Sequence, residues 1–105
     1  MTIEVVPRAE ISEDLRNLPT NDLRFEAIGY LVRLRTEPYL GRPLGMRLLT
    51  GDLSDCRKIF FDEARYRILY RLLPDENRPK QADVIAIGPR AALAVYNDAV
   101  TRLGR

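Results

Sequence analysis

Apolar and cationic residues alternate along the segment CRKIFFDEARYRILYR, residues 56–71. A period of two is that of a β-strand, whose successive side chains point to opposite faces. The alternation breaks at Asp62-Glu63-Ala64, which predicts a hairpin turn between two strands. The side chains expected to be buried are Ile59, Phe61, Tyr66, Ile68 and Tyr70, with the arginines facing solvent. The segment therefore predicts a β-hairpin with one wet, basic face.

The N-terminal part of the chain has helical spacing instead. Ile11, Leu15 and Leu18 lie at i, i+4 and i+7, which marks one stripe of a helix. A second, longer stripe ends before Pro38, since proline cannot continue a helix. The elements expected here are a strand at residues 2–6, a helix at residues 8–18 and a helix at residues 22–36 capped by Thr20 or Asn21. The two helices form a helical hairpin.

The second half of the chain returns to strand patterns. The breakers Gly41, Pro43, Gly45 and Gly51 indicate a loop over residues 38–55, with a short strand at residues 46–49. Strands are expected at residues 55–61, 65–73 and 83–87, the last being the apolar run VIAI. A final helix is expected at residues 91–103, with Leu93, Tyr96, Val100 and Leu103 on one side.

The predicted order of elements is β-α-α-β-β-β-α. Consecutive strands joined by short turns pair antiparallel. Helices that precede them cover one face of the sheet, because two packed layers around one core form a stable arrangement. A chain of 105 residues has the size of one domain. We therefore expect a single α+β domain over residues 1–105, with a small antiparallel sheet of about four strands. Two N-terminal helices cover one face, a C-terminal helix follows, and the other face is open.

Basic residues are concentrated in the strand-rich half. Residues 1–56 hold seven Lys and Arg against nine Asp and Glu, whereas residues 57–105 hold ten against six. The net charge of +2 is thus divided into −2 and +4. This asymmetry indicates either an anionic ligand or simply a solvated cationic surface.

The chain has no histidine and one cysteine, Cys56. It therefore has no Ser-His or Cys-His nucleophile pair, no internal disulfide and no partner for Cys56 in a zinc site. We interpret Cys56 as a structural thiol at the start of a strand. Any catalysis depends on Lys, Arg, Tyr or carboxylate side chains, and no metal or other cofactor is implied.

Membrane association is not expected. No apolar run approaches the roughly 20 residues needed to span a bilayer. Residues 1–7 lack the basic start and apolar core of a signal peptide. We expect a cytoplasmic protein.

Two motifs and the order of elements carry a resemblance to a known family. The motifs are the strand RYRILY, residues 65–70, and the sequence IGPR, residues 87–90, followed by Tyr96. Together they resemble the RelE/ParE superfamily of toxins from bacterial toxin–antitoxin modules, over nearly the whole chain. RelE-like members cleave messenger RNA on the ribosome, whereas ParE-like members poison DNA gyrase and have no nuclease site. The resemblance also implies a cognate antitoxin as a protein partner.

The resemblance implies a set of site residues. RelE-like nucleases use lysines on the strand before the motif, an arginine inside it, an arginine after the last strand and a tyrosine six residues later. By position these are Lys58, Arg67, Arg90 and Tyr96, and the gap between the last two matches the RelE-like branch. Arg57 and Arg65 are flanking cations that we expect to bind RNA. Alternation places Arg57 on the face opposite Lys58 unless a bulge intervenes.

Each side chain has an expected role in cleaving RNA through its own 2′-hydroxyl. Lys58 is the candidate base, with a pKa lowered by neighbouring arginines and partial burial. Arg67 holds the phosphate, Arg90 stabilises or protonates the leaving group, and Tyr96 stacks on or orients the base beside the cut. RelE-type sites often carry a second lysine two residues after the first, and this chain has Phe60 there.

Each residue also has a structural interpretation. Lys58 can equally be a solvated lysine whose charge prevents the strand from pairing with another chain. Arg65 and Arg67 can pair with Asp62, Glu63 or Asp83 as structural ion pairs. Arg90 can simply start the last helix, and Tyr96 can pack in the core. Residues 101–105 are either the frayed end of that helix or a mobile segment that an antitoxin displaces.

The sequence thus favours a toxin that acts as a ribosome-dependent, metal-independent messenger RNA endonuclease and is neutralised by its antitoxin. Two alternatives stay open at this point. One is a gyrase inhibitor of the same fold. The other is a catalytically silent member that acts only in antitoxin-bound repression.

Overall fold

The computed structural model describes residues 2–44 and 52–105. The elements in chain order are β1 (Glu4–Pro7), α1 (Ile11–Arg16), α2 (Asn21–Leu34), β2 (Arg42–Pro43), β3 (Cys56–Phe61), β4 (Tyr66–Leu73), β5 (Gln81–Pro89), the 3-10 turn η1 (Ala91–Leu93) and α3 (Ala94–Leu103). The predicted α+β order is confirmed, with β2 as an additional short strand. The strand expected at residues 46–49 lies outside the described residues.

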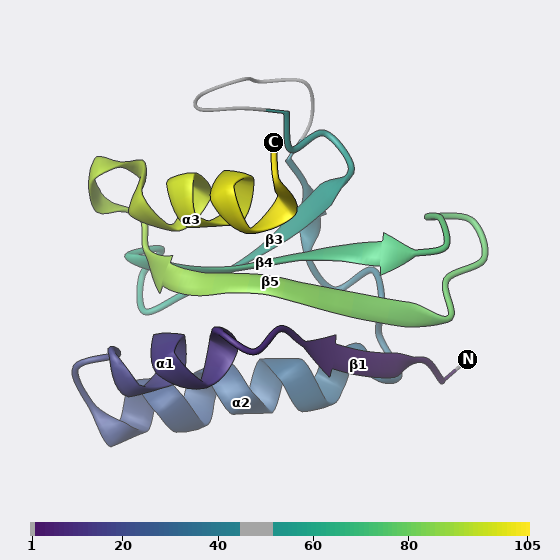
Figure 1. Ribbon diagram of the computed structural model, residues 1–105. Coiled ribbons are helices and arrows are strands. Elements are labelled where there is room, and N and C mark those ends of the chain that lie inside the picture. The colour runs from purple at the N-terminus through teal and green to yellow at the C-terminus, as the bar shows by residue number, and fades with distance from the viewer. Residues whose placement is uncertain (1, 45–51) are drawn as a thin grey trace.

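The strands form one five-stranded sheet in the order β1-β5-β4-β3-β2 (Figure 1). Strands β3 to β5 pair antiparallel in sequence order, as predicted, and the additional strand β2 pairs antiparallel with β3. Strand β1 instead pairs parallel with β5, with Glu4 opposite Gln81. The sheet is therefore mixed at this edge, because the short-turn rule applies only to consecutive strands and β1 is far from β5 in sequence.

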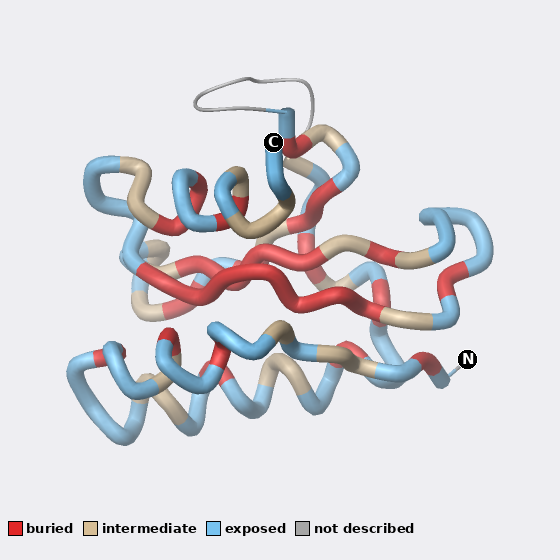
Figure 2. Tube along the Cα trace, in the orientation of Figure 1, coloured by how far each residue is buried: buried red, intermediate tan, exposed pale blue. Residues whose placement is uncertain are grey.

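Helices lie on both faces of the sheet (Figure 1), so the expectation of an open face is wrong. Helices α1 and α2 pack on one side, and α3 packs on the other against β5 and β4. Strand β5 is buried almost throughout (Figure 2), including Val84, Ile85, Ala86 and Ile87. A continuous apolar run of this kind needs cover on both faces. The apolar run VIAI is therefore consistent with a strand that is covered on both faces.

Each face of the sheet has its own apolar core. The core under α1 and α2 includes Ile11, Leu18, Ala27, Leu34, Ile59, Phe61, Ile68, Tyr70 and Val84. The core under α3 is formed by Leu53, Cys56, Leu69, Ile85, Ala86, Val95, Tyr96 and Ala99. Alternate residues of β3 and β4 therefore divide between two cores.

The β3–β4 hairpin forms where the alternation breaks. Asp62, Glu63 and Ala64 have φ values of 53°, 55° and 65°, and the N–H of Arg65 donates to the carbonyl of Asp62 at 3.0 Å. Three consecutive residues in the left-handed region reverse the chain tightly. This prediction is confirmed.

The first helix is shorter than predicted, whereas the second matches closely. The N–H of Arg8 donates to the carbonyl of Val84 at 3.1 Å, which extends the pairing of β1 with β5 and delays α1 until Ile11. The Oγ1 atom of Thr20 accepts a hydrogen bond from the N–H of Leu23 at 3.2 Å, so Thr20 caps α2.

The last helix begins later than its sequence pattern indicates. Residues 91–93 form a 3-10 turn, and Ala92 and Leu93 have φ values of 53° and 59°. Helix α3 then runs from Ala94 to Leu103 and ends at Gly104, which has a φ of 71°. A glycine in the left-handed conformation is a common helix terminator. The kink separates Arg90 from the helix that carries Tyr96.

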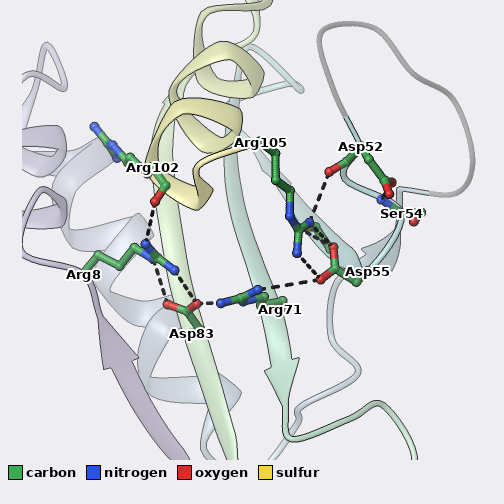
Figure 3. Close-up of polar contacts among 9 residues, drawn as sticks. Arg8, Asp52, Ser54, Asp55, Arg71, Asp83, Arg102 and Arg105 are labelled. Carbon is green, nitrogen blue, oxygen red and sulfur yellow. Dashed lines mark hydrogen bonds and ion pairs between the residues drawn. The ribbon is translucent and has the colours of Figure 1, made fainter.

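Ion pairs hold the C-terminal residues to the sheet (Figure 3). Asp83 on β5 contacts Arg8 at 3.0 Å and Arg71 at 2.9 Å, and Arg71 also lies 3.8 Å from Asp55. The guanidinium of Arg105 binds both carboxylate oxygens of Asp55, at 2.6 and 2.8 Å. The C-terminal residue is therefore paired, contrary to the expectation of a frayed end.

A second ion pair connects α3 to α1. The guanidinium of Arg102 binds the carboxylate of Asp14 at 2.6 and 2.9 Å. The same carboxylate accepts a hydrogen bond from the N–H of Ile87 at 2.9 Å. Strand β1 ends opposite Val84, so Asp14 satisfies a backbone donor on the part of β5 that β1 does not reach.

Candidate functional site

Strands β3 and β4 place three candidate side chains on the face that α3 covers. Lys58 and Phe60 are two residues apart on β3 and share a face, and Arg67 on β4 lies directly opposite Phe60. The guanidinium carbon of Arg67 lies 4.1 Å from the centre of the Phe60 ring, and the Nζ of Lys58 lies 5.1 Å from it. The structure therefore brings together Lys58 and Arg67, with Phe60 in contact with both cations.

Arg67 is buried, with 8% of its surface exposed. The prediction that the strand arginines face solvent is wrong for this residue, because α3 covers its face of the sheet. Its Nη1 donates to the hydroxyl of Tyr96 at 2.9 Å. Its Nε is buried without a hydrogen-bond partner among the described residues.

No carboxylate in residues 2–44 or 52–105 lies within ion-pair distance of Arg67. The structural alternative, an ion pair with Asp62, Glu63 or Asp83, is therefore wrong for Arg67. A buried cation without a counter-charge costs free energy unless an anion binds it. The planar donor fork of arginine suits a phosphate, which makes Arg67 the centre of a candidate anion site.

Tyr96 supports Arg67 from α3. It is 6% exposed and packs in the apolar core under that helix. Its ring centre lies 5.8 Å from the guanidinium carbon of Arg67. The interpretation of Tyr96 as a core residue is confirmed, and its hydroxyl also orients Arg67. In this arrangement the ring is not open for a nucleobase to stack on.

Arg65 and Arg90 lie with Arg67 around an open pocket of about 430 Å³ at the hairpin end of the sheet. The residues that line it are Glu63, Ala64, Arg65, Tyr66, Arg67, Pro89, Arg90 and Ala91. The N–H of Arg90 donates to the carbonyl of Arg65 at 2.9 Å, which joins the two loops that carry these side chains. Both side chains are exposed, and Arg65 forms the expected ion pair with Asp62 at 3.2 Å. The pocket thus collects three arginines.

Arg57 lies apart from this group. It is buried on the opposite face of β3, where its Nε donates to the carbonyl of Gly41 at 3.2 Å and its Nη1 contacts Glu76 at 3.3 Å. Its guanidinium carbon also lies 5.3 Å from the centre of the Tyr39 ring. The structure therefore does not bring Arg57 to the other candidate residues, and the alternation had predicted this opposite placement. The expectation that the strand arginines face solvent is wrong for Arg57 as well, because it lies on the same strand face as the buried Ile59 and Phe61.

Two further findings concern side-chain chemistry elsewhere. Burial raises the pKa of the Cys56 thiol to about 12, and the nearby Asp55 carboxylate adds to this effect. A thiol of this pKa is not a nucleophile at neutral pH, as expected for a structural cysteine. Within the described ranges no group of three or more Asp, Glu or Cys side chains is arranged to hold a metal ion, and no helix there is long and apolar enough to cross a membrane.

Comparison with solved structures finds the same architecture. A double arginine-to-alanine mutant of the Escherichia coli toxin RelE in the free state superposes with a TM-score of 0.71 at 24% identity, covering 98% of this chain and 99% of that one. The chain has the RelE fold.

The RelE fold is also found in complexes with antitoxins. The RelBE2 toxin–antitoxin complex of Mycobacterium tuberculosis matches with a TM-score of 0.63 at 20% identity, over 86% of this chain and 100% of that chain. The intact RelBE complex of E. coli matches with a TM-score of 0.57 at 21% identity, over 83% and 95%. No protein-family model matches the sequence, and no curated protein matches it.

The contacts of Phe60 with the candidate cations were not predicted from the sequence. The sequence interpretation treated Phe60 as the loss of a lysine, whereas the structure places its ring against both Lys58 and Arg67. The signal was present in the spacing, since Lys58 and Phe60 share a strand face. What was missing was the β3–β4 register, which sets Phe60 opposite Arg67.

Proposed function

We propose that this chain is the toxin of a bacterial type II toxin–antitoxin system and that it cleaves messenger RNA on the ribosome without a metal ion. The RelE fold over nearly the whole chain supports this proposal. The observation that carries it is Arg67, a buried guanidinium without a carboxylate partner among the described residues. Such a group is suited to a phosphate of the RNA backbone.

The proposed reaction is a transesterification within the RNA. The 2′-hydroxyl oxygen attacks the adjacent phosphorus while Lys58 accepts its proton, and the bond from phosphorus to the 5′-oxygen breaks. The products are a 2′,3′-cyclic phosphate and a 5′-hydroxyl end, whose oxygen takes up a proton from water. Arg67 binds the phosphoryl oxygens, and Arg90 at the mouth of the pocket stabilises the charge on the leaving oxygen. Tyr96 positions Arg67.

The ribosome is proposed to present the message in a cleavable geometry. Arg65, Arg67 and Arg90 line an open pocket at one end of the sheet, and such a shallow site does not by itself enclose an RNA strand. Holding the reacting oxygen in line with the phosphorus accounts for a large part of the barrier in reactions of this kind. The cytoplasm, where the ribosome works, is the proposed location.

The proposed protein partner is a cognate antitoxin. Helix α2 carries an exposed apolar stripe formed by Phe25, Ile28 and Val32, at i, i+3 and i+7. An amphipathic segment of the partner covers a stripe of this kind by laying its own apolar face against it. Neutralisation of growth arrest by the product of a small adjacent reading frame is the expected result of co-expression.

Primer extension on messenger RNA from induced cells tests the nuclease proposal. We expect new 5′ ends inside translated frames with the wild-type chain, and their loss in Arg67→Ala and Arg90→Ala. Arg78→Ala is the matched control, because Arg78 is exposed in the β4–β5 turn and does not line the pocket. Its cleavage pattern is expected to match that of the wild type.

Two other results would point to the alternatives. Growth arrest with intact messages and loss of DNA supercoiling would identify a gyrase inhibitor. No arrest at all would identify a silent member that acts only with its antitoxin. Either result would contradict the nuclease proposal.

A further inference from the structure

Phe60 is a large aromatic side chain exposed beside the candidate phosphate site. Its surface is 38% exposed, although it lies within strand β3. Two cations lie against its ring, the guanidinium carbon of Arg67 at 4.1 Å and the Nζ of Lys58 at 5.1 Å from the ring centre. Cations contact an aromatic face favourably, so these contacts hold the ring beside Arg67, the proposed phosphate ligand, and Lys58, the proposed general base.

Tyr96, the aromatic residue expected from the family resemblance to meet a base, is not accessible. It is buried under α3, and its hydroxyl accepts a hydrogen bond from Arg67. Exposing its ring requires movement of α3. That helix is held by the buried ion pair of Arg102 with Asp14, and Arg105 pairs with Asp55 just beyond its end.

A single-stranded nucleotide has two parts that such a site can bind. Its phosphates attract arginine and lysine, and its base stacks on an aromatic ring. Stacking needs an exposed ring within one nucleotide of the phosphate contact. Among the aromatic residues described on the face under α3, Phe60 meets this condition and Tyr96 does not.

We propose that Phe60 is the base-stacking platform of the RNA site, in the place of Tyr96. The proposal rests on the proposed function for its ligand, a single-stranded stretch of RNA. Phe60, at the position where the family resemblance implies a second lysine, then supplies a contact to the base instead of a positive charge. Arg67 then binds the phosphate next to the stacked base, and Lys58 keeps its proposed role as the general base.

The absence of tryptophan from the chain allows a direct test. Phe60→Trp introduces one tryptophan, whose fluorescence reports on stacking. The probe is a short RNA with 2′-O-methyl sugars, which cannot cleave itself because the attacking hydroxyl is blocked. We expect the RNA to quench the fluorescence of Phe60→Trp. The matched control is Phe25→Trp, because Phe25 is 70% exposed on α2, away from the site. Quenching is not expected there.

Binding of the same RNA, labelled and followed by anisotropy, separates stacking from charge. Loss of the ring in Phe60→Leu is expected to weaken binding by about 5- to 100-fold. The dependence of affinity on salt concentration is expected to stay that of the wild type, because no phosphate contact is lost. Arg67→Ala is expected to reduce that salt dependence. Thermal unfolding of each variant shows whether it is folded.

The outcomes separate this proposal from the proposed function. If the wild-type chain binds or cleaves RNA, yet Phe60→Leu equals it and Phe60→Trp is not quenched, then base stacking on Phe60 is wrong and the nuclease proposal stands. If the wild-type chain neither binds the probe nor cleaves messages in cells, both proposals fall. Quenching of Phe60→Trp together with intact messages in cells would support the platform and overturn the nuclease.

Discussion

At the level of single residues, the two buried arginines of the hairpin have opposite surroundings. Arg57 is held by the carbonyl of Gly41 and by Glu76, whereas Arg67 has the hydroxyl of Tyr96 and the ring of Phe60. A contact between a desolvated cation and a ring contributes about 2 kcal/mol. Desolvation of an uncompensated charge costs more than that. Arg67 is therefore expected to lower the stability of the fold, as a side chain placed for binding often does.

Replacing Arg67 with methionine is expected to stabilise the fold. Arg67→Met should raise the free energy of unfolding by about 1–3 kcal/mol, since it removes a buried charge and keeps the volume. The control, Arg57→Met, should lower it by about 1–3 kcal/mol, because the carbonyl of Gly41 loses its donor. Urea unfolding measures both. A destabilised Arg67→Met would show that Arg67 is a structural residue.

Cys56 makes stability depend on pH in the alkaline range. Its folded pKa is about 12 against an ordinary value of 9.0, chiefly because the thiol is buried. The folded state favours the protonated thiol, so this stabilisation is complete below pH 9 and is lost as the pH rises toward 12. Cys56→Ala should therefore have a flatter stability profile over this range. Chemical unfolding at several pH values gives the free energy of unfolding of both proteins. An equal dependence on pH in the wild type and in Cys56→Ala would contradict the expectation.

At the level of elements, two ion pairs connect α3 and the chain end to the rest of the fold, and they differ in burial. The pair between Arg102 and Asp14 is largely shielded from solvent, whereas the pair between Arg105 and Asp55 is partly exposed. Removing one partner of a buried pair leaves an uncompensated charge, whereas an exposed pair contributes little. The buried pair also satisfies a donor on β5. We conclude that Arg102 rather than Arg105 holds the helix.

Alanine substitutions at the two arginines test this difference. Arg102→Ala should lower the free energy of unfolding by about 3–5 kcal/mol, and Arg105→Ala by about 0–1 kcal/mol. The Arg105 guanidinium holds the pKa of the Asp55 carboxyl below its usual value. The contribution of this ion pair to stability is therefore present at neutral pH and is lost as the pH falls below about 4. Thermal unfolding at neutral and acidic pH measures both effects, and equal losses at neutral pH would contradict them.

At the level of the whole molecule, the two cores meet at the central strands. Strand β5 pairs with β1 and β4 and is covered by α1 and α3, whereas β2 is a short edge strand paired only with β3. Opening β5 requires disruption of both cores. Opening β2 requires neither.

Hydrogen exchange should reflect this layout. We expect the slowest amide exchange in Gln81–Pro89, near the rate of global unfolding, and fast exchange around Arg42–Pro43. Mass spectrometry of peptides after timed labelling measures both. Slow exchange confined to α1 and α2 would indicate instead that the helical hairpin is the most stable unit.

The sequence by itself determined the local elements and their order. Alternation predicted β3, the turn at residues 62–64 and β4, helical spacing predicted α2, and the opposite placement of Arg57 and Lys58 followed from the strand period. These features depend on neighbours in the chain. The candidate residues of the late basic half were named from the resemblance to the RelE/ParE superfamily, which rests on two short motifs of the sequence.

Only the tertiary structure decided which side chains meet and which are buried. The position of α3 over the second face buries Arg67 and Tyr96, and the β3–β4 register sets Phe60 against Arg67. The parallel pairing of β1 with β5 delays α1, and the ion pairs of Arg102 and Arg105 hold the chain end. Each of these contacts joins residues distant in sequence, and its free energy depends on packing that no local pattern contains.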